Sequence, residues 1–386
     1  MKEFNDLKVA IVADWLTSRG GAERVIVLFA EIFPQADIFT SVFKAKSFPE
    51  LTGRKVSTSW LQKSPLRYRQ QLFPWARPAV FESFNLDDYD LVISSAHAEA
   101  KGVLTKPETL HICYCYTPTR YYWSHYHEYL RTRQLGILNP LIKMIMPSMV
   151  HNLRIWDRVA ADRVDKFVAD SNNAGSRIKK YYEREATTIY PPVDFNRFQG
   201  ESIPGDYYLI VGRQIEYKRT DIAVEAFNLL DLPLRIIGEG PELPRLKKLA
   251  KSSKIEFFGR LSDSETTQQF LGCKAVLFPQ EEDFGIVPLE AMASGKPVIA
   301  YHIGGALETV VDGQTGIFFN VQTSASLAEA IRRFETMSFS SEVCREHARQ
   351  FDQAVFKRQI KAFAEQSWQE HQQRPNFSSQ ILNSNF

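Results

Sequence analysis

The chain has 386 residues, more than one hydrophobic core usually fills, so two domains are the default expectation. A composition of 44% hydrophobic and 24% charged residues is typical of a soluble globular protein, and a net charge of only +2 disfavours a nucleic-acid-binding protein. No apolar run approaches the roughly eighteen residues that span a bilayer, and the N-terminus lacks a signal pattern, so we expect a cytoplasmic protein.

The first half of the chain alternates strands with helices. Residues 7–13 form a continuous apolar strand, and Gly20-Gly21 then opens a helix whose apolar residues recur at helical spacing. A strand, a glycine pair and a helix in succession can bind phosphate, although the pair also suits a tight turn. Further strands are predicted at 91–95 and 111–116. The second of these contains Cys113 and Cys115, which we interpret with the other two cysteines as reduced thiols rather than a zinc site.

A basic aromatic segment covers residues 51–81. It contains no Asp or Glu, and its Lys and Arg residues alternate with Trp, Tyr and Phe. Such a mixture can favour an anionic membrane surface or a lipid phosphate, and a solvated face is the alternative. The aromatic and basic residues at 119–133 strengthen the first interpretation. We therefore expect peripheral association with the inner face of the plasma membrane.

The second half repeats the alternation after a proline-containing segment at 191–198, which suits a linker. Strands are predicted at 207–211, 234–237, 255–258, 275–278 and 297–301. Ser262 and Glu265 have the spacing of a capping box, and Gly304-Gly305 opens a later helix. Ligands of open parallel sheets bind beyond the carboxyl ends of the strands, where the loops of this half lie.

Two carboxylates bracket a predicted helix start in the sequence EEDFGIVPLEAMASGK, at residues 281–296. Pro288 is tolerated only in a first helical turn, and Gly295 supplies the helix end. Gly285 allows a ligand to approach the backbone, and the helix N-terminus favours an anion. Glu290 is placed in the first turn, where it could accept two ribose hydroxyls, while Glu282 could bind a second sugar. Ordinary helix capping is the alternative.

Arg213 and Lys218 follow the first strand of the second half. Both could reach a diphosphate at the strand ends, Arg213 by a planar fork and Lys218 as a point charge. Surface salt bridges are the alternative for such a pair.

The chain resembles glycosyltransferase family 4, the retaining nucleotide-sugar transferases with a GT-B fold. Five motifs in the family's order carry the resemblance: GGAE at 20–23, VGR and YKR within 211–219, IIGEGPE at 236–242, FFGRLSD at 257–263, and Glu282 with seven residues to Glu290. The resemblance is closest to bacterial exopolysaccharide and O-antigen enzymes, through DLVISSAHAEAKGV, HICYCYTPTRYYW and IYPPVD. Many of those resemble mannosyltransferases that use GDP-mannose, so mannose from GDP-mannose is the expected donor.

The resemblance implies an α/β fold of two Rossmann-like domains with parallel sheets facing an interdomain cleft. The N-terminal domain, residues 1–195, would bind the acceptor, which we expect to be a lipid-linked saccharide or glycolipid. A C-terminal helix at 352–371 would pack back on this domain. The donor domain would cover 196–351, and 372–386 would form a disordered tail.

The resemblance also implies the site residues. Glu290 would bind the donor ribose, Glu282 the transferred sugar, and Arg213 and Lys218 the diphosphate, with no cofactor and no metal. The implied catalytic residues are Glu282, His97, Lys218 and Arg213. The implied donor-binding residues are Gly20, Gly21, Arg213, Lys218, Arg260, Leu261, Glu282, Phe284, Gly285, Ile286, Val287 and Glu290, with the nucleobase against Arg260 and Leu261.

One position departs from the family pattern, and one short motif resembles a metal site of other enzymes. Many members carry a histidine where this chain has Tyr116, so His97 after the preceding strand is the nearest candidate for a sugar or phosphate contact, with a structural role as its alternative. Asp88-Tyr-Asp90 superficially matches a metal-binding Asp-x-Asp, but it precedes a first-half strand and we interpret it as a solvated turn. A same-face mechanism, in which the leaving phosphate helps to deprotonate the acceptor, is what the resemblance implies.

Other functions stay open. A transferase could use UDP- or ADP-glucose, and a nucleotide-sugar epimerase could share the fold but would release free sugar. An oxidoreductase is disfavoured because GEG at 238–240 lacks the third glycine of a dinucleotide fingerprint. A catalytically inactive sugar-binding scaffold is the alternative of another class.

Overall fold

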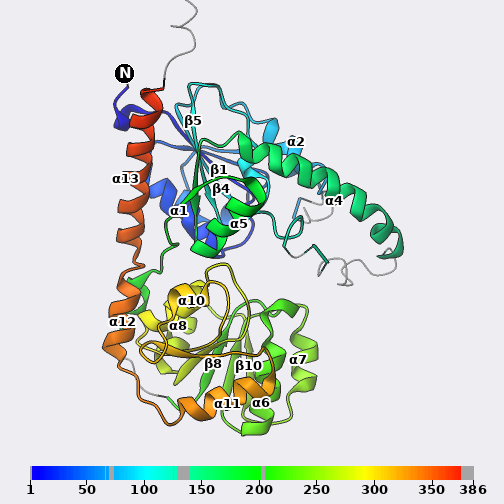
Figure 1. The fold of residues 1–386 in the computed structure, drawn as a ribbon, viewed down its shortest axis with the longest axis vertical. Coiled ribbons are helices and arrows are strands. Elements are labelled where there is room, and N and C mark those ends of the chain that lie inside the picture. The colour runs from blue at the N-terminus through cyan, green and yellow to red at the C-terminus, as the bar shows by residue number, and fades with distance from the viewer. Residues whose placement is uncertain are drawn as a thin grey trace, which may run out of the picture. The chain divides into compact units, whose positions relative to one another are not determined.

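The computed structural model describes residues 2–65, 67–68, 74–124, 126–127, 139–200 and 205–374. These form two compact units, each drawn with its helices around a sheet in Figure 1. Unit 1 comprises the described residues up to Asp170, Ala174–Ile189, and those from Lys357 on. Unit 2 comprises Ser171–Asn173 and Tyr190–Phe356. The predicted tail at 372–386 lies, from residue 375 on, outside the described residues.

Unit 1 is built on a parallel sheet with the strand order β3-β2-β1-β4-β5-β6-β7. The central strands β1, β4 and β5 are buried along their whole length, as continuous apolar runs in a parallel sheet require. The strands are β1 Val9–Ala13, β2 Asp37–Thr40, β3 Val56–Thr58, β4 Leu91–Ala96, β5 Leu110–Cys115, β6 Lys166–Ala169 and β7 Ala186–Thr188. The α-helices of this part are α1 Gly21–Ile32, α2 Arg77–Glu82, α4 Asn139–Asp162 and α5 Asn172–Tyr182.

Unit 2 is built on a second parallel sheet, with the order β10-β9-β8-β11-β12-β13. The predicted capping box is confirmed, because Ser262 and Glu265 exchange both hydrogen bonds at the start of α8. The strands are β8 Tyr208–Val211, β9 Leu234–Ile237, β10 Ile255–Gly259, β11 Ala275–Phe278, β12 Val298–Tyr301 and β13 Gly316–Phe319. The helices are α6 Thr220–Leu230, α7 Leu243–Leu249, α8 Asp263–Gly272, α9 Ile286–Ala293, α10 Ala306–Thr309, α11 Ser324–Phe334 and α12 Ser341–Arg349.

The segment predicted as a linker, 191–198, is instead packed into unit 2. Val193, Phe195 and Phe198 belong to its core, and the Val193 N–H donates to Phe351 O at 2.9 Å. The two prolines do interrupt regular structure, but burial of the apolar side chains that follow them stabilises the folded chain. The chain returns to unit 1 through α13, Gln353–Gln372, whose Ile360 and Ala364 are buried.

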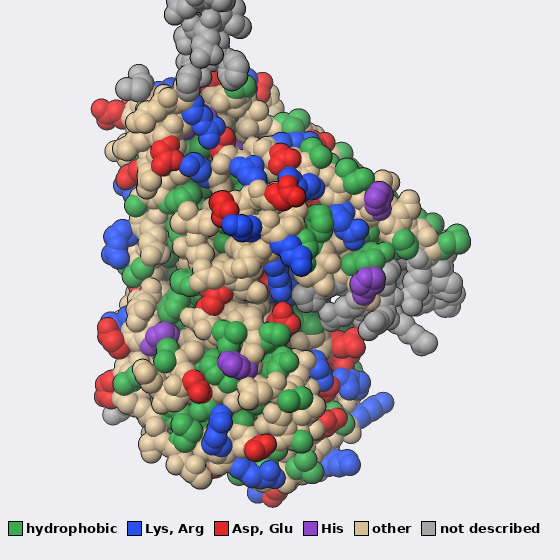
Figure 2. All heavy atoms as spheres, in the orientation of Figure 1, with side chains coloured by type: hydrophobic (Ala, Val, Ile, Leu, Met, Phe, Trp, Pro, Cys, Tyr) green, Lys and Arg blue, Asp and Glu red, His purple; other side chains and the backbone are tan. Residues whose placement is uncertain are grey.

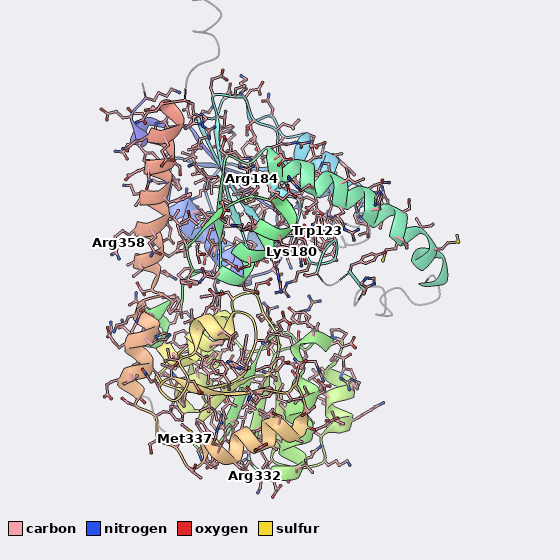
Figure 3. The ribbon with its side chains drawn as sticks, in the orientation of Figure 1. Trp123, Lys180, Arg184, Arg332, Met337 and Arg358 are labelled. Atoms are coloured by element: carbon pink, nitrogen blue, oxygen red, sulfur yellow. The ribbon has the colours of Figure 1, made fainter. Side chains whose placement is uncertain are left out.

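A buried ionic network joins α4 to the loop after β4 in unit 1. The Asp157 carboxylate accepts hydrogen bonds from Lys101 Nζ at 2.6 Å, Tyr182 Oη at 2.7 Å, Trp123 Nε1 at 2.8 Å and Thr119 Oγ1 at 3.2 Å. Trp123, labelled in Figure 3, also stacks on Tyr181 of α5. Burial opposes the charge of Lys101, yet the nearby Asp157 raises its pKa above the ordinary value, so the lysine is charged at neutral pH.

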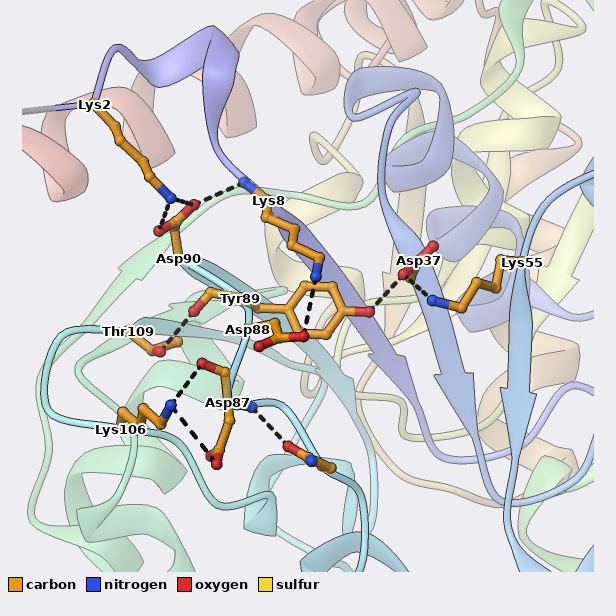
Figure 4. A network of polar contacts seen from close by, with 11 residues as sticks. Lys2, Lys8, Asp37, Lys55, Asp87, Asp88, Tyr89, Asp90, Lys106 and Thr109 are labelled. Atoms are coloured by element: carbon orange, nitrogen blue, oxygen red, sulfur yellow. Dashed lines mark hydrogen bonds and ion pairs between the residues drawn. The ribbon is translucent and has the colours of Figure 1, made fainter.

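The Asp88-Tyr-Asp90 segment is only partly the solvated turn that was predicted (Figure 4). Asp88 is exposed, but Tyr89 is buried and donates to Asp37 Oδ2 at 2.5 Å. Asp90 accepts from Lys2 Nζ at 2.8 Å and from the Lys8 N–H at 2.9 Å. Asp90 and the exposed Asp88, which pairs with Lys8, therefore contact the N-terminal segment, whereas Tyr89 contacts β2.

Exposed apolar side chains gather on α4. Met144, Ile145, Ile155 and Val159 are each about half exposed or more, and hydrophobic side chains lie along this helix in Figure 2. Trp60 and Trp75, from the basic aromatic segment, are also exposed. Within the described residues, no helix is both long enough and apolar enough to span a bilayer.

The acid stability of unit 1 should depend on His111, which is buried in β5 and shares a hydrogen bond of 2.8 Å with Ser94. Burial lowers the pKa of His111 to about 4. The pKa of His111 is lower in the folded chain than its unfolded value of about 6.5, because burial favours the neutral ring. The free energy of unfolding is therefore highest above pH 6.5 and falls as the pH is lowered towards 4. At pH 5 the loss amounts to about 2 kcal/mol.

Tryptophan fluorescence isolates this effect, since all six tryptophans belong to unit 1. Urea unfolding at pH 7 and pH 5 should show a smaller drop in stability for His111→Gln than for the unsubstituted chain. An equal drop in both proteins would show that His111 does not titrate as expected.

Candidate functional site

The candidate site of unit 2 lies where its strand order reverses, between β8 and β11. Loops that leave neighbouring strands in opposite directions open a crevice at such a point. The loop after β8 carries Arg213 and Lys218, and the loop after β11 carries Glu282. The topology of the sheet therefore brings these predicted residues to one place.

Backbone packing fixes the loop after β8. A Cβ atom on Gly238 would lie 1.9 Å from Gly212 O, so the loops after β8 and β9 touch backbone to backbone. The buried Gln214 side chain donates to Gly212 O at 2.7 Å and accepts from Thr220 Oγ1 at 2.8 Å. Lys218 then ends a short 3-10 helix, in a loop whose base is rigid.

Glycines fix the loop after β11 in a similar way. Gly285 has φ +95°, and a Cβ there would lie 2.8 Å from the ring of Phe278. The Gly305 N–H donates to Glu282 O at 2.9 Å, and a Cβ on Gly305 would overlap the backbone of Phe284. The loop that holds Glu282 is thus clamped by the start of α10.

Lys218 and Glu282 form an ion pair across this switch point. Their side chains are only 19% and 16% exposed, so the attraction is screened less than that of a surface pair. A cation and a carboxylate held together at a strand end can serve a phosphate and a sugar hydroxyl respectively. The sequence predicted both residues for one site, and the structure brings them into contact.

Glu290 is placed differently from the expectation. Because α9 begins at Ile286, Glu290 lies in the second turn of the helix and not in the first. Its side chain is also buried, at 8% exposed. Arg197 lies 3.4 Å from its carboxylate and reaches Asp263 O and Thr267 Oγ1 in α8 at 3.4 and 3.5 Å. Arg197 was missed because it stands in the presumed linker.

A hollow of about 390 Å³ adjoins this arginine. Arg197 and side chains from the first turns of α8 line it, namely Asp263, Ser264, Thr267 and Gln268. Arg260 and Leu261, predicted to lie against the nucleobase, directly precede that helix, and Arg260 is exposed. The Phe284 ring is buried and stacks on Tyr190, so only its backbone is available to a ligand. Arg213 is exposed, while Ile286 and Val287 are half-buried at the start of α9.

Unit 1 carries its own polar cluster at the switch point between β1 and β4. Gly20 precedes α1, which begins at Gly21, as predicted. His97 follows β4, and its Nδ1 lies 3.1 Å from Asp14 Oδ2. Tyr116, where the resemblance implied a histidine in many members, shares a hydrogen bond with Ser95 Oγ at 2.8 Å and donates to Ala22 O at 3.0 Å. Asp14 was not singled out from the sequence, since a single acid after a strand is a weak signal.

The described residues hold no group of three or more His, Cys, Asp or Glu side chains placed to bind a metal ion. The four cysteines are buried free thiols, as the sequence indicated.

Comparison with known proteins agrees with this geometry. Residues 194–351 match the model of the glycosyl transferases group 1 family. The chain is 30% identical over 184 residues to an uncharacterized glycosyltransferase of Methanocaldococcus jannaschii, which covers 46% of this chain and 52% of that protein. It is 24% identical over 249 residues to an alpha-1,3/1,6-mannosyltransferase of Dictyostelium discoideum, covering 52% and 58%. The chain thus spans about half the length of these curated relatives.

A solved structure extends the likeness to nearly the whole chain. The Anabaena protein HepE in complex with UDP superposes with a TM-score of 0.67 at 17% identity, over 93% of this chain and 99% of that one. The two Rossmann-like units and this likeness confirm the predicted GT-B fold. Unit 2 contains a domain of the glycosyl transferases group 1 type.

Proposed function

We propose that the chain is a retaining glycosyltransferase that moves a hexose from a nucleoside diphosphate sugar to a saccharide acceptor. The observation that carries this proposal is the Lys218–Glu282 pair, held at the switch point of the group 1 domain. An epimerase or an inactive scaffold would share the fold, but turnover that depends on an acceptor separates a transferase from both.

In this proposal the basic residues contact the diphosphate, where negative charge develops, and the acidic residues contact sugar hydroxyls. Lys218 and Arg213 neutralise the diphosphate as its bond to the sugar breaks, helped by the N-terminus of α9 at Gly285 to Val287. Glu282 accepts hydrogen bonds from hydroxyl groups of the transferred sugar, and Glu290 accepts hydrogen bonds from those of the ribose. No metal is assigned a role, because two cations and a helix N-terminus supply the positive charge. The departing phosphate helps to deprotonate the acceptor on the same face.

Mannose from GDP-mannose is the first candidate donor, supported by the mannosyltransferase relative. UDP-glucose is the second, because the Anabaena structure contains UDP. The acceptor is proposed to be a lipid-linked saccharide. The exposed apolar residues of α4 and the exposed Trp60 and Trp75 would then lie against an anionic membrane. Flotation with anionic liposomes at low salt tests this part, and a protein that stays with the unbound fraction contradicts it.

The donor is identified by a thermal-shift screen against GDP-mannose, UDP-glucose and ADP-glucose. A ligand that binds only the folded chain raises its melting temperature, by mass action. One donor should raise Tm by several degrees, whereas a flat response to all three sugars and to their nucleoside diphosphates would contradict the proposed function.

Arg197→Met should weaken binding of the matching nucleoside diphosphate about tenfold, equivalent to about 1.4 kcal/mol. The substitution removes the cation beside Glu290 and one wall of the hollow at α8. Isothermal titration calorimetry measures the change. Arg333→Met is the matched control, since Arg333 lies in α11 and donates to Phe318 O at 2.8 Å, apart from the residues that line the hollow. Equal affinity for both variants would remove Arg197 from the site.

A further inference from the structure

The switch point of unit 1 has a polar cluster that the donor site in unit 2 does not explain. β1 and β4 are neighbours in the sheet and are followed by Asp14 and His97. In open parallel sheets a ligand binds beyond the strand ends at this point. The cluster therefore occupies the position at which unit 1 is expected to meet a substrate.

Asp14 organises the loop after β4. Its carboxylate accepts hydrogen bonds from the backbone N–H groups of His97 at 2.8 Å, Ala98 at 2.9 Å and Ala100 at 2.7 Å. The residue is 2% exposed. A buried carboxylate with three such donors is held in one orientation, since losing any of them would leave a buried polar group unpaired.

The same carboxylate fixes the imidazole of His97. Nδ1 lies 3.1 Å from Asp14 Oδ2, and the ring meets Trp15 edge to face at 4.4 Å. Because Nδ1 faces the carboxylate, a proton on Nδ1 can be donated to Asp14. A neutral imidazole carries only one N–H, so Nε2 then has the lone pair. The His97 side chain is about one-third exposed, whereas Asp14 is enclosed. In this tautomer Nε2, the ring nitrogen that does not face Asp14, is thus an acceptor.

Two further titratable groups face this imidazole. Glu23, in the first turn of α1, interacts with both His97 and Asp14, and burial raises the pKa of its carboxyl. Burial also raises the pKa of Tyr116 well above its ordinary value, so its phenol stays protonated. Because the Tyr116 hydroxyl bonds to Ser95 and Ala22, it is engaged within the fold. His97 is the better-placed group to accept a hydrogen bond from a ligand.

We propose that Asp14 is a positioning residue that holds His97 with Nδ1–H towards itself and Nε2 presented as a hydrogen-bond acceptor for a saccharide hydroxyl. This inference rests on the proposed glycosyl transfer and adds Asp14 to it. The hydroxyl belongs either to the transferred sugar or to the acceptor sugar, which the kinetic experiment distinguishes.

The tautomer is measured first, without any substrate. Long-range proton–nitrogen spectra of the full chain with labelled histidine should show one ring in the Nδ1–H form that disappears in His97→Gln. In Asp14→Asn this ring should move towards the Nε2–H form. A His97 ring that is Nε2–H in the unsubstituted chain, or that is unchanged in Asp14→Asn, overturns the role of Asp14.

Two substitutions of His97 then separate a substrate contact from a structural role. Asparagine places its amide where Nδ1 was and can keep the bond to Asp14, whereas glutamine places its amide where Nε2 was. A substrate contact predicts that kcat falls at least tenfold in His97→Asn and less in His97→Gln, with the KM for the nucleotide sugar little changed. A structural role predicts the reverse order, which would overturn the proposal.

The assay uses the donor found in the thermal-shift screen and a polyprenyl-diphosphate-linked saccharide as the acceptor probe. Loss of donor hydrolysis together with transfer in His97→Asn assigns the hydroxyl to the transferred sugar, and loss of transfer alone assigns it to the acceptor. Absence of turnover in the unsubstituted chain with every donor would contradict the proposed function, while the tautomer measurement would still decide the role of Asp14.

Discussion

Lys218→Ala is expected to reduce sugar transfer at least a hundredfold, which corresponds to about 2.7 kcal/mol of lost transition-state stabilisation. The substitution removes the cation that the proposed mechanism places on the departing diphosphate, and it leaves Glu282 without its ion-pair partner. Release of nucleoside diphosphate from the preferred donor measures the rate. Glu290→Ala should also abolish transfer, by removing the ribose contact.

Lys274→Ala is the matched control for this experiment. Lys274 precedes β11 at its amino end and pairs with Glu335, whereas Glu282 follows the carboxyl end of the same strand. The control removes an ion pair of unit 2 without touching the proposed site, so its rate should stay within about twofold. Lys218→Ala and Glu290→Ala proteins that turn over like this control would refute the site assignment.

Asp157→Ala is expected to destabilise unit 1 by about 3–5 kcal/mol, because it leaves the buried Lys101 ammonium without its counter-charge. Three further donors, from Thr119, Trp123 and Tyr182, lose the same acceptor. Urea unfolding followed by tryptophan fluorescence reports on unit 1 alone.

Asp162→Ala provides the comparison in the same helix. Asp162 is 58% exposed and pairs with Arg158 one turn earlier, an arrangement worth about 0.3–0.5 kcal/mol. If the two variants unfolded at similar urea concentrations, the buried network would not be a principal support of unit 1.

Most strands of unit 2 could be predicted from the sequence. Each of them is a short apolar run that is followed by Gly, Pro or a helix-capping residue. β11 and the capping box of α8 show this directly. The Lys218 and Glu282 loops could be placed together because parallel strands end at one edge of the sheet.

Two features, one in each unit, were harder to predict. β3 lies inside the basic aromatic segment and is half-buried throughout, so its apolar signal is weak. Phe284 was expected to face a donor, but its ring fills the core beside Tyr190. A sequence motif identifies which residues form a loop, but the burial of each side chain depends on neighbours that are distant in the chain.

The two residues that sequence reasoning missed share a physical reason. Asp14 acts through backbone N–H groups more than eighty positions away, and Arg197 meets Glu290 only after the 191–198 segment folds into unit 2. Neither contact leaves a local pattern in the sequence. Both contacts depend on the strand order and on the packing of the core.

Acceptor-dependent release of nucleoside diphosphate by the full chain tests the central claim most directly. With GDP-mannose or UDP-glucose and a polyprenyl-diphosphate-linked saccharide, the account predicts release that rises with acceptor, yields a glycosylated lipid with retained anomeric configuration, and disappears in Lys218→Ala. Nucleotide release without a glycosylated product, or no release with any donor while the chain is folded, would contradict it.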